Sequence, residues 1–116
     1  MKFSCEKAIL QQAIATTSWA VSSKSAIPTL EGLLIEATDT VKITGYNLET
    51  GISTKIPSDV AEPGKIVINA KILNDIIRLF PDDVVTISVS ETLTALIMCG
   101  NAKYEIMGLA ADERCV

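Results

Sequence analysis

The feature that most constrains the fold of this chain is an internal repeat. A strand-like segment that runs into an amphipathic helix occurs at residues 2–14 and again, 63 positions later, at residues 65–77. Each helix is followed by two alternating segments around an acidic-Thr turn, Asp39-Thr40 in the first copy and Glu91-Thr92 in the second. Because a repeat of both apolar positions and turns restricts architecture, we predict one unit of strand, helix and three strands, written twice.

The second copy shows the change from strand to helix most clearly. Ile66, Val67 and Ile68 form a β-branched run, which is typical of a strand buried on both sides. Asn69 can cap the helix that follows, and Pro81 comes directly after its expected end. Between Asn69 and Pro81, apolar residues recur at helical spacing, namely Leu73, Ile76, Ile77 and Phe80. Polar residues fill the opposite face, namely Lys71, Asn74, Asp75 and Arg78.

The remaining elements follow from the same patterns. Two such units can pair their strands around a pseudo-twofold axis with both helices on one face of antiparallel sheets, which is an α+β architecture. The length suits one domain over residues 1–116. We expect a strand at 1–6, a helix at 7–22, a hairpin at 31–45, a strand at 49–56, a surface link at 57–63, a hairpin at 84–99 and a last strand at 102–107. The first repeat then covers about 1–57 and the second about 64–107.

Composition predicts an aliphatic core in a reducing compartment. The chain is 48% hydrophobic but only 4% aromatic, so Ile, Leu, Val and Ala must fill the interior without metal or disulfide staples. The three cysteines have no metal-like spacing; Cys5 and Cys99 fall in predicted strands as small hydrophobes, and the state of Cys115 is open. Polar residues interrupt the N-terminus, so we expect no signal peptide, no membrane span and a cytoplasmic protein.

The residues needed for most enzyme active sites are missing from the sequence. There is no histidine, which removes Ser-His and Cys-His nucleophiles and most zinc sites, and no phosphate-binding glycine loop. Asp82-Asp83 and Asp112-Glu113 are expected in solvated turns, and Cys99 has no cationic neighbour in sequence. We therefore expect neither an enzyme nor a cofactor site.

The chain has a net charge of −4, and three of its ten cationic residues fall on the two predicted helices. The helix layer would display Lys7, Lys71 and Arg78, with Lys24 at its rim in a polar loop. Such a face suits a phosphate backbone without base readout. The alternative, ordinary solvated helix faces and a solvated loop lysine, stays open because only a few charges are involved.

Trp19 is the unusual residue of the first helix, since it lies near the polar margin. We expect a partly buried packing residue at the helix end. The alternative is a contact for a partner or for a nucleic-acid strand.

Several short motifs occur along the chain in a specific order and spacing. They are Met1-Lys2-Phe3, Ser22-Ser23-Lys24 with Ile27-Pro28-Thr29-Leu30 and Gly32, Ile43-Thr44-Gly45 before Leu48-Glu49, Gly64, Ala70-Lys71, Leu79-Phe80-Pro81, and Gly108-Leu109-Ala110-Ala111-Asp112-Glu113. Together these motifs resemble the first domain of the bacterial sliding clamp family, the β subunit of DNA polymerase III. The similarity covers nearly the whole chain.

The resemblance implies the DNA-clamp fold and a role in DNA replication. Clamps of this family are homodimeric rings with three such domains in each subunit, and helices line the hole. The ring encircles double-stranded DNA, independently of sequence, and holds the replicative polymerase there as a processivity factor without chemistry. The polymerase and the clamp loader would bind later domains, and residues 108–116 would begin the linker toward them.

The resemblance also assigns residues to two surfaces. Lys24, Lys71 and Arg78 match basic positions that face DNA, beside the layer residue Lys7, whereas Ile76, Tyr104 and Ile72 match the contact that closes the ring.

Three departures from the family pattern weaken this assignment. Lys24 stands where arginine is common, the first helix carries little charge beyond Lys7, and Arg114-Cys115-Val116 replaces an aromatic-proline pair. DNA attraction through this domain would then be weak, and enclosure would do most of the holding.

An alternative of a different class uses the last strand alone. Tyr104 would lie on an edge strand, and an open edge can pair with another chain. The chain could therefore be a stand-alone oligomerisation or peptide-binding module without a DNA role.

Overall fold

The computed structural model describes residues 1–21, 31–47 and 49–111, and its elements follow the predicted repeat. The first unit comprises β1 (Lys2–Glu6), α1 (Lys7–Ser18), β2 (Gly32–Ala37), β3 (Val41–Tyr46) and β4 (Gly51–Ile56). A short β5 (Asp59–Glu62) leads to the second unit, which comprises β6 (Gly64–Asn69), α2 (Ala70–Leu79), β7 (Val84–Val89), β8 (Thr94–Cys99) and β9 (Ala102–Met107).

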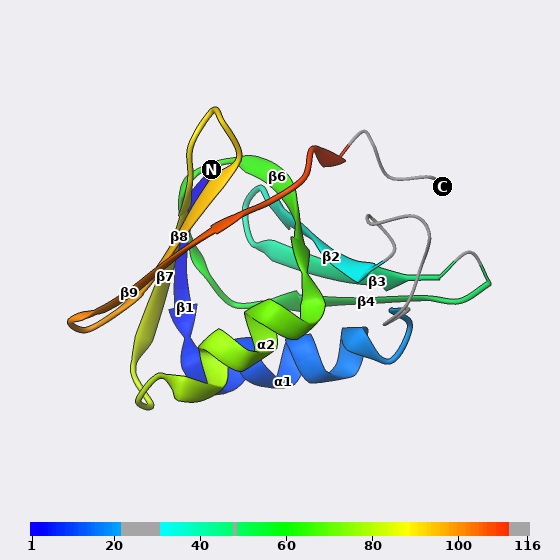
Figure 1. Cartoon of the computed structure of the whole chain (residues 1–116), viewed down its shortest axis with the longest axis horizontal. Helices are drawn as coiled ribbons and strands as arrows, with labels where there is room; N and C mark the ends of the chain where they lie inside the picture. The colour runs from blue at the N-terminus through cyan, green and yellow to red at the C-terminus, as the bar shows by residue number, and fades with distance from the viewer. Residues whose placement is uncertain (22–30, 48, 112–116) are drawn as a thin grey trace.

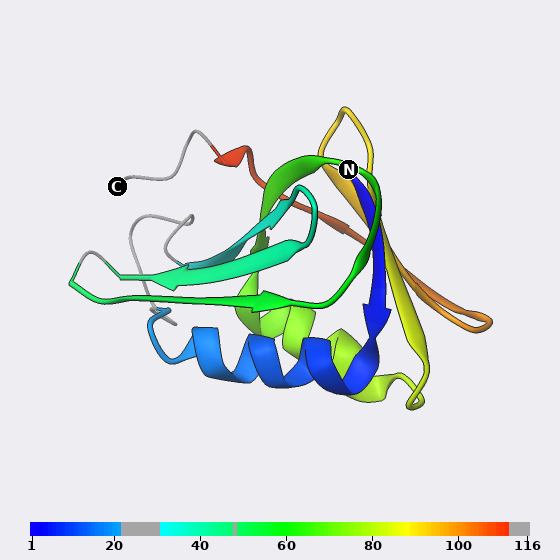
Figure 2. The ribbon, with the colours of Figure 1, turned by 180° about the vertical axis from the view of Figure 1, so that it is seen from behind.

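The two units exchange their first strands to build two antiparallel sheets. Sheet A has the order β5-β1-β7-β8-β9, and sheet B has the order β4-β3-β2-β6. Strand β1 of the first unit therefore lies beside β7, and β6 of the second unit lies beside β2. The two sheets form two walls, and both helices lie side by side along one end of them (Figure 1; Figure 2 shows the reverse). The predicted α+β arrangement, with both helices on one face, is confirmed.

The core is aliphatic, as the composition predicts. Apart from Phe3 and Phe80, the large side chains buried between the sheets and helices are Leu and Ile. Each such side chain contributes roughly 1.5–3 kcal/mol when it leaves water. Val67 is also buried, at 1% exposure, so the strand predicted to be covered on both sides is confirmed. The thiols of Cys5 and Cys99 are buried as expected.

Each unit ends with a segment that turns back onto the first strand of the same unit. Strand β5 pairs with β1, and after β9 the backbone of Leu109 bonds Val67 of β6 in both directions, at 3.0 and 2.8 Å. The prediction of a surface link over 57–63 was therefore wrong for Asp59–Glu62. Edge pairing uses main-chain groups only, so the polar side chains of β5 remain exposed and mask the strand.

Helix α1 is shorter than predicted. It ends at Ser18 instead of near residue 22, because Ala20 N donates to Thr17 O and Val21 N donates to Ser18 O in a tightened last turn. The end of α1 also touches β3. A Cβ added at Gly45 would lie 1.9 Å from Thr17 O, so only glycine permits this approach.

Helix α2 begins as predicted. Asn69 Oδ1 accepts a hydrogen bond of 2.9 Å from Ile72 N, which is the N-cap contact that the sequence indicates. Within the described ranges, neither helix is long and apolar enough to cross a membrane.

Candidate nucleic-acid interface and partner edge

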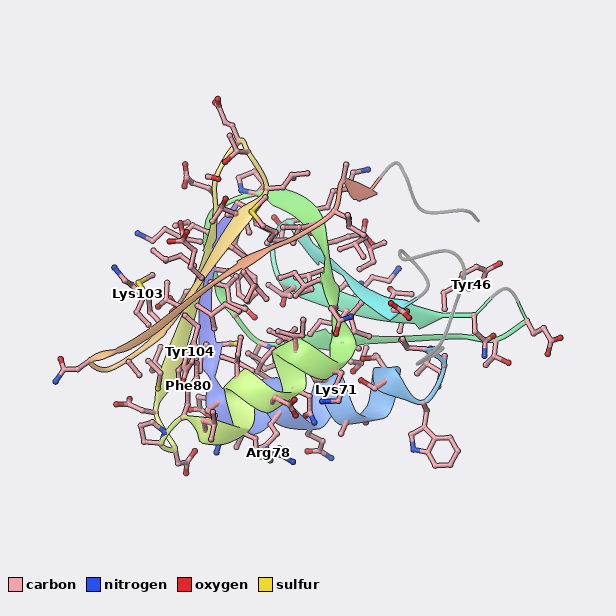
Figure 3. All side chains as sticks on the ribbon, in the orientation of Figure 1. Tyr46, Lys71, Arg78, Phe80, Lys103 and Tyr104 are labelled. Carbon is pink, nitrogen blue, oxygen red and sulfur yellow. The ribbon has the colours of Figure 1, made fainter. Side chains whose placement is uncertain are left out.

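Helix α2 points a charged face away from the sheets. Lys71 and Arg78, labelled in Figure 3, lie on the side of α2 opposite its buried residues, and their side chains are 85% and 64% exposed. Both are predicted DNA-facing residues. The helix thus places two cations about two turns apart on one outward surface.

Asp75 sits between these two cations and binds both. Its Oδ2 lies 3.0 Å from Lys71 Nζ, and its Oδ1 lies 3.3 Å from Arg78 Nη2. The three charges sum to one positive charge, so the surface is less cationic than Lys71 and Arg78 alone indicate. The i,i+4 and i,i+3 spacing of these residues was the signal in the sequence that could have revealed the pairing.

Helix α1 contributes almost no charge to the same surface. Lys7 is only partly exposed, and its backbone N donates to Asp83 O at 3.0 Å. The exposed positions that follow are neutral, namely Ala8, Gln12, Ala15 and Thr16. Lys24 lies outside the described residues, so its prediction stays a prediction.

Trp19 caps the C-terminal end of α1 and is 86% exposed. The expectation of a partly buried packing residue was therefore wrong. Because Trp19 follows Leu10 by nine residues, or two and a half turns, it projects from the side of α1 opposite the core. A large aromatic side chain that buries almost nothing leaves the alternative, a contact surface, in place.

The outer edge of sheet A is open. Among the described residues, strand β9 has β8 on one side and no strand on the other, and Tyr104 lies on it as predicted. The Tyr104 ring is 38% exposed and packs against Phe80, with ring centroids 5.8 Å apart (Figure 3). An edge strand with a supported aromatic side chain can accept a strand from another chain.

The predicted partner residues on α2 divide into one exposed and one buried residue. Ile72 is 47% exposed, whereas Ile76 is only 7% exposed and belongs to the core, so Ile76 offers little surface to a partner. Leu79 is 70% exposed and was not singled out from the sequence. It follows Ile72 by seven residues, so it lies on the same helix stripe, and this spacing could have found it.

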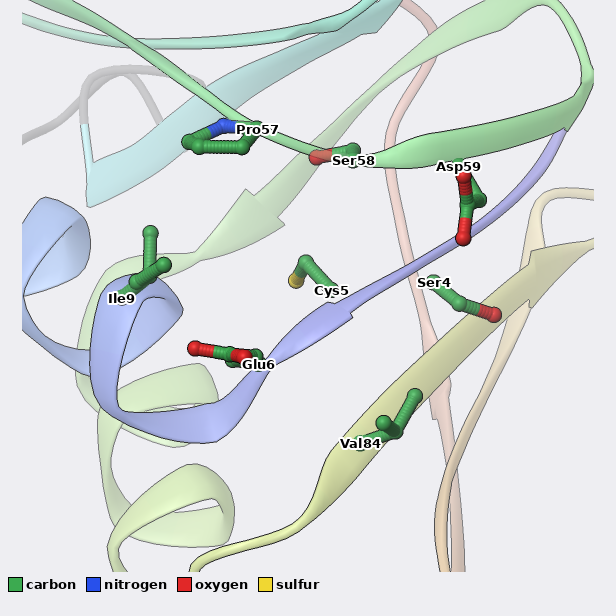
Figure 4. Close-up of a pocket in the computed structure, with 8 residues that line it drawn as sticks. All are labelled: Ser4, Cys5, Glu6, Ile9, Pro57, Ser58, Asp59 and Val84. Carbon is green, nitrogen blue, oxygen red and sulfur yellow. The ribbon is translucent and has the colours of Figure 1, made fainter.

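One hollow on the surface of the described residues does not resemble an active site. It has a volume of about 450 Å³ and lies beside β1, where Cys5, Glu6, Ile9 and Asp59 line it (Figure 4). Burial, followed by the nearby Glu6 carboxylate, raises the pKa of the Cys5 thiol to about 12, so the thiol stays protonated at neutral pH and is a poor nucleophile. Among the residues that the structure describes, no group of acidic, cysteine or histidine side chains could hold a metal ion.

Comparisons with known proteins agree on one family. The family described as DNA polymerase III beta subunit, N-terminal domain, matches residues 1–114 of this chain. The chain is 33% identical over 122 residues to the beta sliding clamp of Bacillus subtilis and 30% identical over 122 residues to that of Synechocystis sp.. These alignments cover 97% of this chain but 32% and 31% of the two relatives, so the chain spans about a third of their length.

Solved structures give the same result for the fold. A putative DNA polymerase III beta subunit from Eubacterium rectale superposes with a TM-score of 0.97 at 34% identity, over 100% of this chain and 32% of that one. The DNA polymerase sliding clamp of Bacillus subtilis superposes with a TM-score of 0.95 at 32% identity, over 100% of this chain and 33% of that one.

Proposed function

The chain belongs to the family of the DNA polymerase III beta subunit, whose N-terminal domain it matches, and we propose that it works as the first domain of a sliding clamp. In this proposal the clamp is a cytoplasmic ring of two subunits that encircles double-stranded DNA and gives the replicative polymerase its processivity. The chain itself catalyses nothing, and polymerase activity belongs to the partner enzyme.

One observation carries the proposal most directly: both helices lie together on one face, and α2 directs Lys71 and Arg78 outward from it. A helical face with exposed cations can follow phosphates of any sequence, since it offers charge without groups placed for reading bases. Because Asp75 neutralises part of this charge, attraction should be weak. Weak attraction suits a ring that holds DNA by enclosure and must slide.

The partner surface in this proposal is the open edge formed by β9 and the exposed stripe of α2. Tyr104, Ile72 and Leu79 supply apolar area there, and the unpaired main chain of β9 can extend sheet A into a neighbouring subunit. This use of the edge would also protect it from unspecific pairing.

Retention on DNA tests the DNA face. In the clamp that carries this chain as its first domain, replacing Lys24, Lys71 and Arg78 by Gln should shorten retention on circular DNA and reduce its dependence on salt concentration. The matched control replaces Lys42, Lys55 and Lys65, three exposed lysines of sheet B, by Gln. An unchanged salt dependence in the first variant, or an equal change in the control, would count against the proposed DNA face.

Subunit association tests the partner edge. Tyr104→Asp should weaken the dimer, because a carboxylate would be buried at the seam without a partner. Sedimentation velocity at decreasing protein concentration measures the effect, and thermal unfolding confirms that the variant is folded. Lys103→Ala, one residue earlier on the opposite face of β9, is the control. A dimer that survives dilution as well as the parent does would refute this use of the edge.

A further inference from the structure

Trp19 does not fit a purely electrostatic DNA surface. It is the only tryptophan of the chain and is 86% exposed at the end of α1. An exposed indole places a large apolar area in water without stabilising the fold, so packing gives no reason for its presence. Any role for this side chain must therefore lie in contact with something outside the described residues.

The position of Trp19 ties it to the same surface as Lys71. Helices α1 and α2 run beside each other, and a hollow of about 180 Å³ between them is lined by Ser18 and Val21 of the α1 end and by Lys71 and Asn74 of α2. Trp19 follows Ser18 directly and projects away from the core of α1, as Lys71 does from that of α2. Both side chains therefore belong to the outward surface of the helix layer.

The chemistry of an indole selects a particular form of nucleic acid. Its flat face stacks on a nucleobase and thereby contributes affinity that depends little on sequence. In an uninterrupted duplex both faces of every base are already stacked, and only base edges and the backbone are exposed. An indole thus gains most from an unpaired base, in a single strand or at the end of a duplex.

Resting on the proposed DNA role of the helix layer, we propose that Trp19 stacks on an unpaired base and makes this surface prefer single-stranded DNA or a duplex end to continuous duplex. Lys71 and Arg78 hold the phosphates, and Trp19 adds a contact that salt does not screen. Apart from the partly exposed Lys7, the outward face of α1 is neutral, so Trp19 is the main contribution of that helix.

Intrinsic fluorescence tests the contact directly, because all tryptophan emission of the chain comes from position 19. At low salt, a short oligothymidine should quench this emission in a saturable way. A duplex hairpin with the same number of phosphates, closed at both ends by non-nucleotide linkers so that it has no free end and no unpaired base, should quench it much less. Equal quenching by both DNAs, or quenching by neither, would overturn the inference.

Substitutions separate stacking from charge. Trp19→Ala should weaken binding of labelled oligothymidine about tenfold and binding of the hairpin less than twofold, with an unchanged salt dependence. Trp19→Phe should restore part of the loss. Val84→Ala, which shortens an exposed apolar side chain of β7 outside the helix layer, should leave both affinities unchanged. An unchanged oligothymidine affinity in Trp19→Ala, or an equal loss for both DNAs, would refute the stacking contact.

Variants of the cationic residues distinguish failure of the stacking contact from failure of the proposed function. Replacing Lys71 and Arg78 by Gln should weaken binding of both DNAs and reduce the salt dependence. If this result holds while Trp19 has no effect, only the stacking contact is wrong. If neither DNA binds the parent chain at low salt, or if the cations have no effect on either, both the contact and the DNA-facing role of the layer are wrong.

Discussion

The two repeats share one topology but treat their outer sheet edges differently. Helix α1 packs against β3 and β4, so the outer edge of sheet B lies under a helix. Helix α2 packs against β6 and α1, and it leaves Leu79, Ile72 and the neighbouring β9 edge exposed. A pseudo-symmetric domain thus acquires one covered side and one side that is available to a partner.

One pair of equivalent residues accounts for part of this difference. In sheet B, Ile43 of β3 pairs with Ile35 of β2, and in sheet A, Ile97 of β8 pairs with Ile87 of β7, so β3 and β8 are equivalent strands. Gly45, two residues after Ile43, therefore corresponds to Cys99, two residues after Ile97. At Gly45 the end of α1 approaches the strand backbone, whereas at Cys99 a thiol fills the interval and donates to Pro81 O at 3.8 Å. The side chain of Cys99, at the position where Gly45 has only a hydrogen atom, therefore separates the end of α2 from sheet A.

The largest expected effect breaks this close approach. Gly45→Ala should destabilise the chain by about 3 kcal/mol or more, because the new Cβ would collide with Thr17 O, a backbone atom that cannot move alone. Urea unfolding followed by circular dichroism measures the change. Gly51→Ala is the control, because its Cβ would make only ordinary contacts, at 3.5 Å from Tyr46 Cδ1 and 3.9 Å from Gly45 O. Similar stabilities of the two variants would show that α1 does not press on β3.

Alkaline pH should destabilise the chain through the first repeat. Its strand β1 carries a buried thiol, Cys5, at the position where β6 of the second repeat has Ile68, which does not titrate. Burial raises the pKa of Cys5 from 9.0 to about 12, so between these values the unfolded chain loses this proton while the native chain keeps it. The free energy of unfolding should then fall by about 1.4 kcal/mol per pH unit above pH 9, with no effect below it.

The measurement is urea unfolding at a series of pH values for the parent and Cys5→Ala. Lysines titrate in both proteins, so the difference between them isolates the thiol. Parallel pH profiles above pH 9 would contradict the prediction.

Helix capping provides a smaller contrast between the repeats. Asn69→Ala should cost about 1 kcal/mol, because Ile72 N loses its acceptor at the start of α2. The equivalent Glu6→Ala should change stability by less than about 0.5 kcal/mol, since Glu6 makes no side-chain cap bond to α1. Thermal unfolding of both variants measures the difference in stability loss, and equal losses would contradict the prediction.

The smallest effect on stability should accompany an increase in DNA binding. Asp75→Asn removes two exposed ion pairs, worth about 0.3–0.5 kcal/mol each at most, and frees Lys71 and Arg78. Under the proposed function, retention on DNA should lengthen and its salt dependence should steepen. Asp82→Asn, an exposed carboxylate outside both helices, controls for net charge. Weaker retention in Asp75→Asn would mean that the ion pairs position the cations productively.

Much of the architecture follows from local patterns. The repeat, the capped start of α2 and the aliphatic core were all predictable, because side-chain periodicity records which face of an element is buried. The edge position of Tyr104 came from the resemblance and from its place on the last predicted strand. The pairing of Asp75 with both cations could also have been found from its spacing. Strand β5 could not, since main-chain pairing at an edge leaves no trace in side chains.

Patterns within each element specify the two repeated units and the residues that fill their core, since burial of aliphatic side chains depends on local periodicity. Where those units meet follows instead from the packing of the whole chain: α1 ends at Ser18 with its last turn against Gly45, and Trp19 is exposed to water. These outcomes depend on contacts between segments far apart in the chain, and no local pattern encodes the distance between a helix end and the strand it touches.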